Sequence, residues 1–122
     1  MYEISSDVIR GYNDTMILYI LLEAPSYGYE ISKKIKEYSD EKYIIKETTH
    51  YSAFSRMEKN GYIESFSDET NTEGNRKKRT YYRITDAGKQ FYADKCDEWL
   101  LTKEVVENFI SVGKTSTSIS GL

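Results

Sequence analysis

The residues best suited to chemistry are a run of cations near the middle of the chain. The segment RKKRTYYR, residues 76–83, holds five basic side chains and no acidic one. Upstream of it, the hydroxyl side chains Thr49, Ser52 and Ser55 recur three residues apart. Arginine and lysine attract phosphate oxygens, and hydroxyl groups hydrogen-bond to phosphates and base edges. These residue types together are typical of a surface that binds nucleic acid.

Catalytic chemistry has little support in the sequence. A nucleophile and its base would have to be Cys96 and His50, the single cysteine and histidine of the chain, and both fall on helix faces that are expected to pack. The sequence has no glycine-rich phosphate loop, no metal-ligand cluster and no pair of carboxylates in a recognisable setting. We therefore expect no enzyme activity, no metal and no cofactor.

Composition and the amino terminus indicate where the protein works. With 39% apolar and 30% charged residues, the chain has the composition of a soluble globular protein. A lone cysteine cannot form an internal disulfide, which fits a reducing cytosol. The first residues, MYEISSD, lack the basic start and apolar stretch of a secretory signal. The longest apolar run, residues 16–22, is far shorter than the roughly 20 residues that span a membrane. We expect a cytoplasmic protein with no membrane partner.

The charge of the chain is unevenly distributed. The formal net charge is -3, yet residues 48–83 hold seven basic and five acidic side chains, while the segments on both sides are acidic. Local potential, rather than net charge, determines the attraction to phosphate. A short cationic run is by itself usually a solvated loop, so its position in the fold has to decide between the two interpretations.

Apolar periodicity predicts the order of the elements. Helices are expected at residues 8–23, with Asp7 as the N-cap, and at residues 26–38, with Ser26 as the N-cap. A third helix runs from about residue 47 to Asn60-Gly61, where the glycine can take the left-handed conformation that ends a helix. Two strands with alternating polarity, at 62–66 and 80–84, surround a polar loop and predict a hairpin. A last helix, capped by Thr85, extends from 86 to about 111, and residues 43–45 could form a further short strand.

This order predicts a mainly α fold with a β-hairpin wing. Residues 1–84 are expected to form a winged helix-turn-helix DNA-binding domain, 85–112 a long C-terminal dimerisation helix and 113–122 a flexible tail. In such a fold the third helix enters the major groove and the hairpin touches the adjacent backbone. The buried face of that helix should hold His50, Phe54 and Met57, and its exposed face holds Thr49, Ser52, Ser55, Arg56 and Lys59. Because the cationic run falls on the wing, DNA binding is favoured over a solvated loop.

Three motifs, in this order, resemble the PadR family of transcriptional regulators. They are Gly-Tyr-Glu-Ile at 28–31, Thr-x-Tyr-x-x-Phe-x-Arg-Met-Glu-x-x-Gly at 49–61, and Tyr-Tyr-Arg-Ile-Thr-x-x-Gly at 81–88. The similarity extends from residue 7 to about residue 110. The single helix after the wing resembles the compact subfamily that includes drug-sensing repressors of multidrug efflux genes. The resemblance implies a DNA-binding transcriptional regulator.

The resemblance also implies which residues meet DNA. Thr49, Tyr51, Ser52 and Ser55 would face the DNA, with Lys59 near the backbone, and Arg76, Lys77, Lys78 and Arg79 would reach phosphates or the minor groove. Two positions depart from the family: His50 stands where leucine is usual, and Ser52 where proline is frequent. The Tyr51 ring could instead pack on helix 26–38 and expose only its hydroxyl. Arg56 is left out of the set because it can pair with Glu58 or Glu64 at the surface.

The last helix carries a seam for a partner helix. Large or apolar side chains follow a coiled-coil rhythm, interrupted at Lys103; they are Tyr92, Cys96, Trp99, Val106 and Ile110. One short domain needs no such seam for its own core, so we predict a homodimer that binds a pseudo-palindromic operator. The helix could also pack back on the first helix through Phe91 and Leu100, and both contacts can coexist.

We therefore predict a PadR-like dimeric regulator, a repressor of its own gene or of a neighbouring, efflux-type gene. Within the resemblance, Trp99 occupies the place of a central tryptophan that stacks planar hydrophobic ligands at the dimer interface, with Tyr92 and Cys96 beside it. Release by such a ligand would follow. The alternative is a winged-helix module that binds an acidic protein partner through its wing and has no sequence-specific DNA binding.

Overall fold

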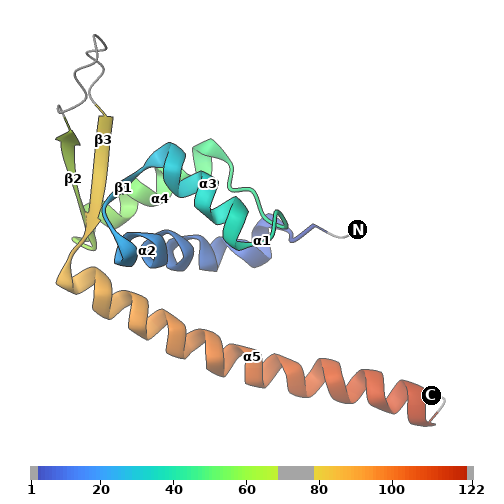
Figure 1. Cartoon of the computed structure of the whole chain (residues 1–122). Coiled ribbons are helices and arrows are strands. Elements are labelled where there is room, and N and C mark those ends of the chain that lie inside the picture. Colours follow the sequence, from blue (N-terminus) through green and yellow to red (C-terminus); the bar gives the residue numbers. More distant parts are fainter. Residues whose placement is uncertain (1–2, 69–78, 121–122) are drawn as a thin grey trace. The chain divides into compact units, whose positions relative to one another are not determined.

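The computed structural model describes residues 3–68 and 79–120, and it divides into two compact units, 1–92 and 93–122. Figure 1 shows the β2–β3 hairpin rising from the helices of the first unit. The elements, in chain order, are α1 (Ser6–Ile9), the 3-10 helix η1 (Arg10–Tyr12), α2 (Asn13–Glu23), β1 (Ser26–Tyr27), α3 (Gly28–Tyr38), α4 (Glu47–Lys59), β2 (Ile63–Asp68), β3 (Arg79–Ile84) and α5 (Asp86–Ser120). The predicted mainly α fold with a hairpin wing is confirmed.

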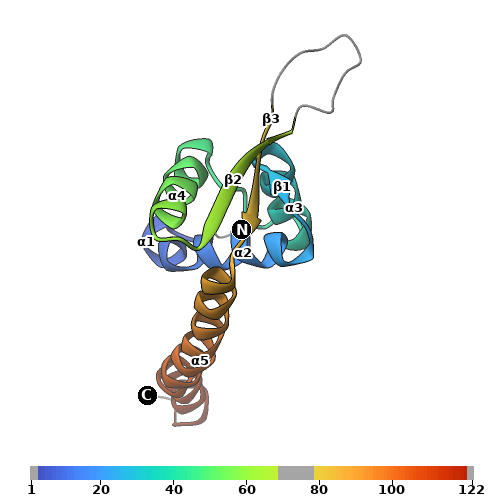
Figure 2. The same cartoon turned by 90° about the vertical axis from the view of Figure 1, so that its left-hand side faces the viewer.

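The sheet has three antiparallel strands in the order β1-β3-β2. Figure 2 shows α3 beside β1 and α4 beside β2. The β2–β3 hairpin matches the prediction, but β1 was not predicted because two residues are too few to show a period. The short strand expected at 43–45 is wrong: this segment has no strand backbone. The segment is apolar because its side chains pack on the first unit without forming a strand. Ile45 is buried, and the Tyr43 hydroxyl donates to Asn13 Oδ1 at 2.6 Å.

The first predicted helix is broken into α1, η1 and α2. Its N-cap is Ser5 rather than Asp7, because Ser5 Oγ accepts a hydrogen bond from the Val8 amide at 3.3 Å. Gly11 lies in the 3-10 turn, and glycine weakens an α-helix by leaving its backbone unrestrained. The prediction of one helix over residues 8–23 is therefore wrong for residues 8–12 and correct from Asn13 onward.

The second helix, α3, begins at Gly28, two residues after its predicted start at residue 26. Ser26 is buried in β1, where its hydroxyl donates to the Glu30 carboxylate, so it does not cap α3. Ile31 and Ile35 in the middle of α3 are buried, whereas Tyr38 at the end of the helix is 52% exposed.

The core of the first unit lies between these helices and the sheet. Its fully buried apolar side chains come from three helices, one loop and one strand: Ile17, Leu18, Ile20 and Leu21 of α2, Ile31 and Ile35 of α3, Ile45 of the loop, Ala53, Phe54 and Met57 of α4, and Ile63 of β2. The predicted buried face of α4, with His50, Phe54 and Met57, is confirmed. Gly61 has φ +81°, the left-handed conformation predicted for the end of this helix.

The last helix starts at a junction with the wing. Thr85 Oγ1 accepts from the Gly88 amide at 3.0 Å and donates to the Gly61 carbonyl at 2.6 Å, so the predicted cap also ties α5 to the end of α4. Phe91 stacks on Tyr62 with ring centroids 4.2 Å apart and packs against the core of the first unit. The helix continues to Ser120, past its expected end at residue 112, since no proline stops it and helix interiors tolerate an isolated glycine. It therefore includes most of the segment expected to be a flexible tail.

Replacing Gly88 with alanine should destabilise the protein. A Cβ at this position would lie 2.1 Å from the Tyr62 carbonyl oxygen and 2.8 Å from Ile84 Cγ1, so α5 or β2 must shift. We expect Gly88→Ala to lower the free energy of unfolding by about 1–3 kcal/mol. The matched control is Gly11→Ala, where a Cβ meets nothing within 4 Å. Urea unfolding of the two variants measures the difference, and equal midpoints would contradict the crowding at Gly88.

Candidate nucleic-acid interface

One face of α4 is exposed while the opposite face is fixed in the core. Tyr51, Ser52, Ser55 and Lys59 are exposed, and the predicted Thr49 is half-buried. Thr48, which the sequence reasoning missed, is exposed and lies four residues before Ser52, on the same side of the helix. The exposed stripe of α4 is therefore Thr48, Ser52, Ser55 and Lys59, with Tyr51 beside it.

The Tyr51 ring is held by its own helix. It packs edge-on against the His50 imidazole, with centroids 4.5 Å apart, and against Phe54 at 6.2 Å. The side chain is nevertheless 54% exposed. The alternative in which the ring packs on α3 and exposes only its hydroxyl is therefore wrong, and much of the ring is available to a partner.

His50 joins the two helices of the helix-turn-helix. The residue is 4% exposed, and its Nδ1 shares a hydrogen bond of 2.7 Å with the Ser32 hydroxyl of α3. Its Nε2 is buried without a hydrogen-bond partner among the described residues. Burial lowers the pKa of the imidazole from its usual 6.5, and nearby Glu47 opposes that shift. His50 is thus a neutral, buried group whose polarity Ser32 partly satisfies.

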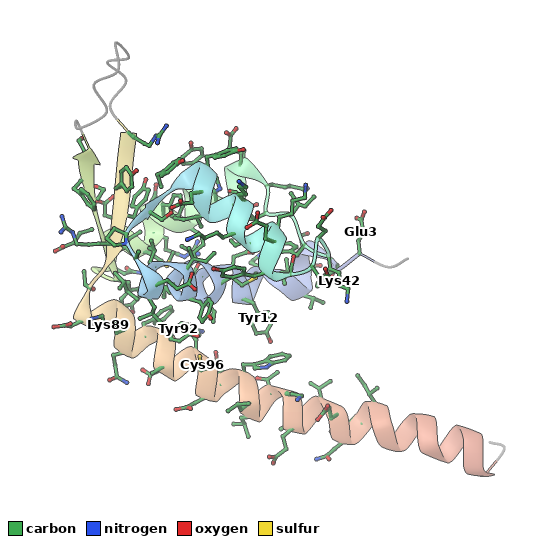
Figure 3. All side chains as sticks on the ribbon, viewed as in Figure 1. Glu3, Tyr12, Lys42, Lys89, Tyr92 and Cys96 are labelled. Carbon is green, nitrogen blue, oxygen red and sulfur yellow. The ribbon has the colours of Figure 1, made fainter. Side chains whose placement is uncertain are left out.

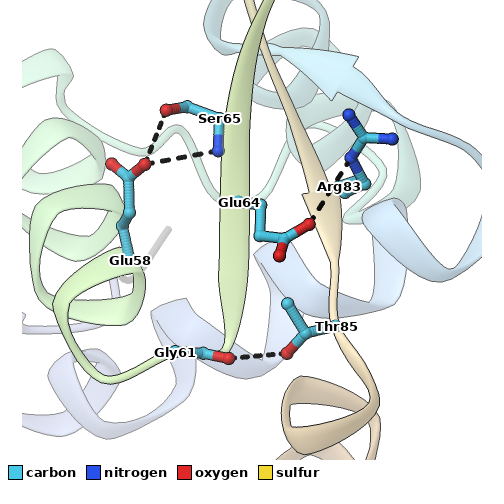
Figure 4. Close-up of polar contacts among 6 residues, drawn as sticks. All are labelled: Glu58, Gly61, Glu64, Ser65, Arg83 and Thr85. Carbon is cyan, nitrogen blue, oxygen red and sulfur yellow. Dashed lines mark hydrogen bonds and ion pairs between the residues drawn. The ribbon is translucent and has the colours of Figure 1, made fainter.

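Polar contacts also fix the second half of α4. Arg56 forms an ion pair with Asp14 of α2, so the predicted partners Glu58 and Glu64 are wrong. Figure 4 shows that Glu58 instead accepts hydrogen bonds from Ser65, at 2.5 Å from the hydroxyl and 3.3 Å from the amide. These contacts attach α4 to α2 and to β2, so the exposed stripe has a defined orientation in the first unit.

The described part of the wing contributes one of the four predicted cations. Arg79 begins β3, is exposed, and has its guanidinium carbon 4.3 Å from the centroid of the Tyr27 ring. Arg76, Lys77 and Lys78 lie outside the described residues. Arg83, at the other end of β3, stacks over Phe66 at 4.2 Å and pairs with Glu64 at 3.7 Å. The wing strands therefore carry two stacked arginines with different surroundings.

A shallow depression of about 500 Å³ lies at the base of the wing. Its lining is Glu58, Gly61, Ile63, Glu64, Ser65, Arg83 and Thr85. The polar groups among them already bind one another, through Glu58 with Ser65, Thr85 with Gly61, and Arg83 with Glu64 (Figure 4). The depression thus offers a small molecule few unsatisfied polar groups.

Neither a metal centre nor a spanning helix is found in the part of the chain that the structure describes. No group of three or more His, Cys, Asp or Glu side chains is arranged to hold a metal ion there. In the same residues, no helix is both long and apolar enough to cross a membrane.

The predicted seam of α5 differs along its length. Tyr92 packs against the core of the first unit, with its ring 6.3 Å from that of Tyr19, and Cys96 is half-buried (Figure 3). Farther along, Trp99, Val106 and Ile110 are 44%, 44% and 58% exposed. Leu100 is 61% exposed, and Leu101, Val105 and Phe109, which were not part of the predicted seam, are exposed as well. The exposed apolar surface of this helix is wider than a single heptad stripe.

Comparison with known proteins identifies the family. The model of the "Transcriptional regulator PadR-like family" matches residues 17–94, more than half of the chain. The chain belongs to the PadR-like family of transcriptional regulators. A transcriptional regulator from Clostridium thermocellum is 58% identical, with a TM-score of 0.79 over 86% of this chain and 99% of that one. A PadR family transcription regulator from Clostridium difficile R20291 is 36% identical, with a TM-score of 0.69 over 81% and 98%.

A curated protein of Lysinibacillus sphaericus, called "uncharacterized protein X", is 40% identical over 88% of this chain and 95% of its own length. Membership of the PadR-like family means that the protein regulates transcription by binding DNA and is not an enzyme. The resemblance stated from the motifs is confirmed, as is the winged-helix fold. The alternative of an interaction module that does not bind DNA is disfavoured.

Lowering the pH should destabilise this PadR-like protein through His50. Because burial lowers the pKa of His50 below 6.5, the unfolded chain binds more protons than the folded chain just below that pH. Stability is therefore full above about pH 6.5 and falls as the pH decreases toward the lowered pKa. Thermal midpoints between pH 7.5 and 5.5 measure this loss.

The control is His50→Leu, which keeps an apolar side chain in the core and removes the only histidine of the sequence. Its midpoint should be nearly flat over the same range, because carboxylates titrate mainly below about pH 5. An identical slope in both proteins would mean that His50 is not the group that titrates.

Proposed function

We propose that this PadR-like protein is a cytoplasmic, homodimeric repressor that reads a pseudo-palindromic operator with α4 and the wing. The observation that carries the proposal is the division of α4 into two faces. Phe54, Met57 and His50 are buried, whereas Ser52, Ser55 and their neighbours on the exposed stripe carry small hydroxyl groups. Small hydroxyl side chains let a helix approach the floor of the major groove and hydrogen-bond to base edges.

The proposal assigns contacts with base edges and contacts with phosphates to different residues. Ser52, Ser55 and Tyr51 read base edges, with the flanking Thr48 or Thr49 and Lys59 near the backbone. Arg79, together with Arg76, Lys77 and Lys78, supplies the ionic contacts of the wing. Contacts to phosphate give affinity that depends on salt, and contacts to base edges give specificity. The acidic remainder of the chain limits indiscriminate DNA binding.

The proposed dimer uses α5. Trp99, Val106 and Ile110 leave apolar surface exposed along this helix, and Leu101, Val105 and Phe109 widen it. A soluble chain rarely leaves so much contiguous apolar surface in water, and a second copy is the simplest cover. A twofold axis then places two copies of α4 about 34 Å apart, one turn of DNA.

We further propose that a planar hydrophobic ligand binds at Trp99 and releases the repressor. Trp99 is 44% exposed and Cys96, one turn earlier, is half-buried. A flat aromatic pair contributed by two copies would stack a planar guest on its faces. Tyr92 belongs to the packed base of this helix, so its part in such a site is smaller than the sequence implied. The regulated gene is the protein's own or a neighbouring efflux gene.

Selection of DNA from a random pool at two salt concentrations tests the operator proposal. We expect a palindrome bound by two chains, with an affinity that falls on a log-log plot with a slope of several units. Alanine at Arg76, Lys77, Lys78 and Arg79 should flatten that slope by about 0.9 for each phosphate that the wing no longer neutralises.

The matched comparison is Tyr51→Ala with Ser52→Ala, which should relax base preference and leave the salt slope nearly unchanged. Wing variants that keep both affinity and slope would rule out the ionic role of the wing. Helix variants that keep operator discrimination would remove these two residues from the set that reads DNA.

Fluorescence of Trp99, the single tryptophan, tests ligand binding. Planar aromatic dyes should quench it in a saturable way, and Trp99→Ala should weaken dye binding at least about tenfold if stacking supplies about 1.4 kcal/mol. Sedimentation must show that the variant is still dimeric. An unchanged dye affinity in that dimer would refute the site.

A further inference from the structure

A row of three aromatic rings crosses the outer face of the sheet. Tyr27 of β1 is the register partner of Tyr81 in β3, which is in turn the partner of Phe66 in β2. The ring centroids are 5.2 Å apart between Tyr27 and Tyr81 and 5.6 Å apart between Tyr81 and Phe66. All three side chains are only partly buried. The row therefore lies on the face of the sheet away from the core.

An arginine stacks on each end of this row. The guanidinium carbon of Arg79 lies 4.3 Å from the Tyr27 ring, and that of Arg83 lies 4.2 Å from the Phe66 ring. Alternation along β3 places Arg79, Tyr81 and Arg83 on the same side of the strand. The two ends thus have nearly the same cation–π distance.

The two arginines differ in what else they contact. Arg83 also forms an ion pair with Glu64, its register partner in β2, so a carboxylate already engages its charge. Arg79 is the first residue of β3, where the strand leaves the wing loop, and it is exposed. Its register partner is Asp68 at the end of β2, and the stack on Tyr27 is the contact that its guanidinium makes among the described side chains. Arg79 is therefore the stacked arginine that can serve a partner.

Stacking suits an arginine that binds phosphate. The ring occupies one flat face of the guanidinium, whereas the N–H donors point outward in the plane and stay available for a bidentate contact. Holding the long side chain before binding also reduces the entropy that is lost when the contact forms. A stacked arginine thus binds an anion better than one that moves freely.

Tyr27 also connects this arginine to the helix-turn-helix. It is the N-cap residue of α3 and pairs with Tyr81 across the sheet, so its backbone is fixed at the start of that helix. The ring therefore sets the place of Arg79 relative to α3, and through the contact of Ser32 with His50, relative to α4.

We infer that Tyr27 is a positioning residue for DNA binding, whose ring holds the Arg79 guanidinium so that it binds a backbone phosphate. The inference rests on the proposed contact between the wing and DNA, and adds to it a residue 52 positions upstream of Arg79. It assigns the base of the wing a fixed phosphate contact rather than a freely moving charge.

The test compares Tyr27→Leu with Tyr27→Phe on the full-length protein and its selected operator. Leucine keeps apolar bulk beside Tyr81 but has no π face, so affinity should fall roughly three- to tenfold and the salt slope should decrease by up to about 0.9. Phenylalanine keeps the face and should behave like the wild type. Phe66→Leu is the matched control, because it removes the stack under Arg83 and should leave the slope unchanged.

Two more measurements separate the stack from general effects on folding. In the DNA-free protein, NMR signals of the Arg79 side chain should show an upfield ring-current shift that Tyr27→Phe keeps and Tyr27→Leu loses. Arg79→Lys keeps the charge but not the flat guanidinium, so it should weaken binding without altering the core. In an Arg79→Ala background, Tyr27→Leu should have no further effect on DNA affinity.

The outcomes test the positioning role of Tyr27 separately from the proposed contact between the wing and DNA. If Arg79→Ala lowers the slope and Tyr27→Leu does not, the positioning role is overturned and the wing contact stands. If Tyr27→Phe loses as much affinity as Tyr27→Leu, the hydroxyl rather than the ring makes the contact, which also overturns it. If neither Arg79→Ala nor the fourfold wing variant changes the slope, the proposed wing contact itself fails.

Discussion

The arrangement of the first unit depends on the ring stack around Phe54. This side chain is 2% exposed and lies between His50 of its own helix, at 5.1 Å, and Tyr82 of the central strand, at 4.4 Å. Because Tyr82 is paired with Ser26 and Ser65 in the neighbouring strands, one ring links α4 to the whole sheet. This buried contact holds one face of α4 against the sheet, so the opposite face is left exposed and polar.

Periodicity predicted the elements that are long enough to show a period. The buried face of α4, the two long strands and the Thr85 cap followed from spacing, because each depends on neighbours within one element. The break at Gly11 did not, because many helices contain an isolated glycine without a break, and the two-residue strand β1 did not, because its partner strand β3 lies far along the chain. The pairing of Arg56 with Asp14 joins residues 42 apart, and spacing within α4 made nearer carboxylates the expected partners.

The sequence predicted that the candidate interface is polar, but it did not identify every residue of that interface. Thr48 and Thr49 lie four and three residues before Ser52, and because both spacings place a side chain on the same side of a helix, spacing alone could not distinguish them. The stack of Arg79 on Tyr27 was hidden for a different reason, since the two residues meet only when β1 pairs with β3. The chemical types of the interface residues were predictable from the sequence, whereas the register of the sheet determines which side chains meet.

The burial of the single histidine affects the charge that lies beneath the surface proposed to face DNA. His50 lies directly beneath the surface proposed to face DNA, and its lowered pKa keeps it uncharged near neutrality. The group beneath that surface therefore adds no charge to it near neutrality, and acidification of the cell would affect DNA binding through the stability of the fold.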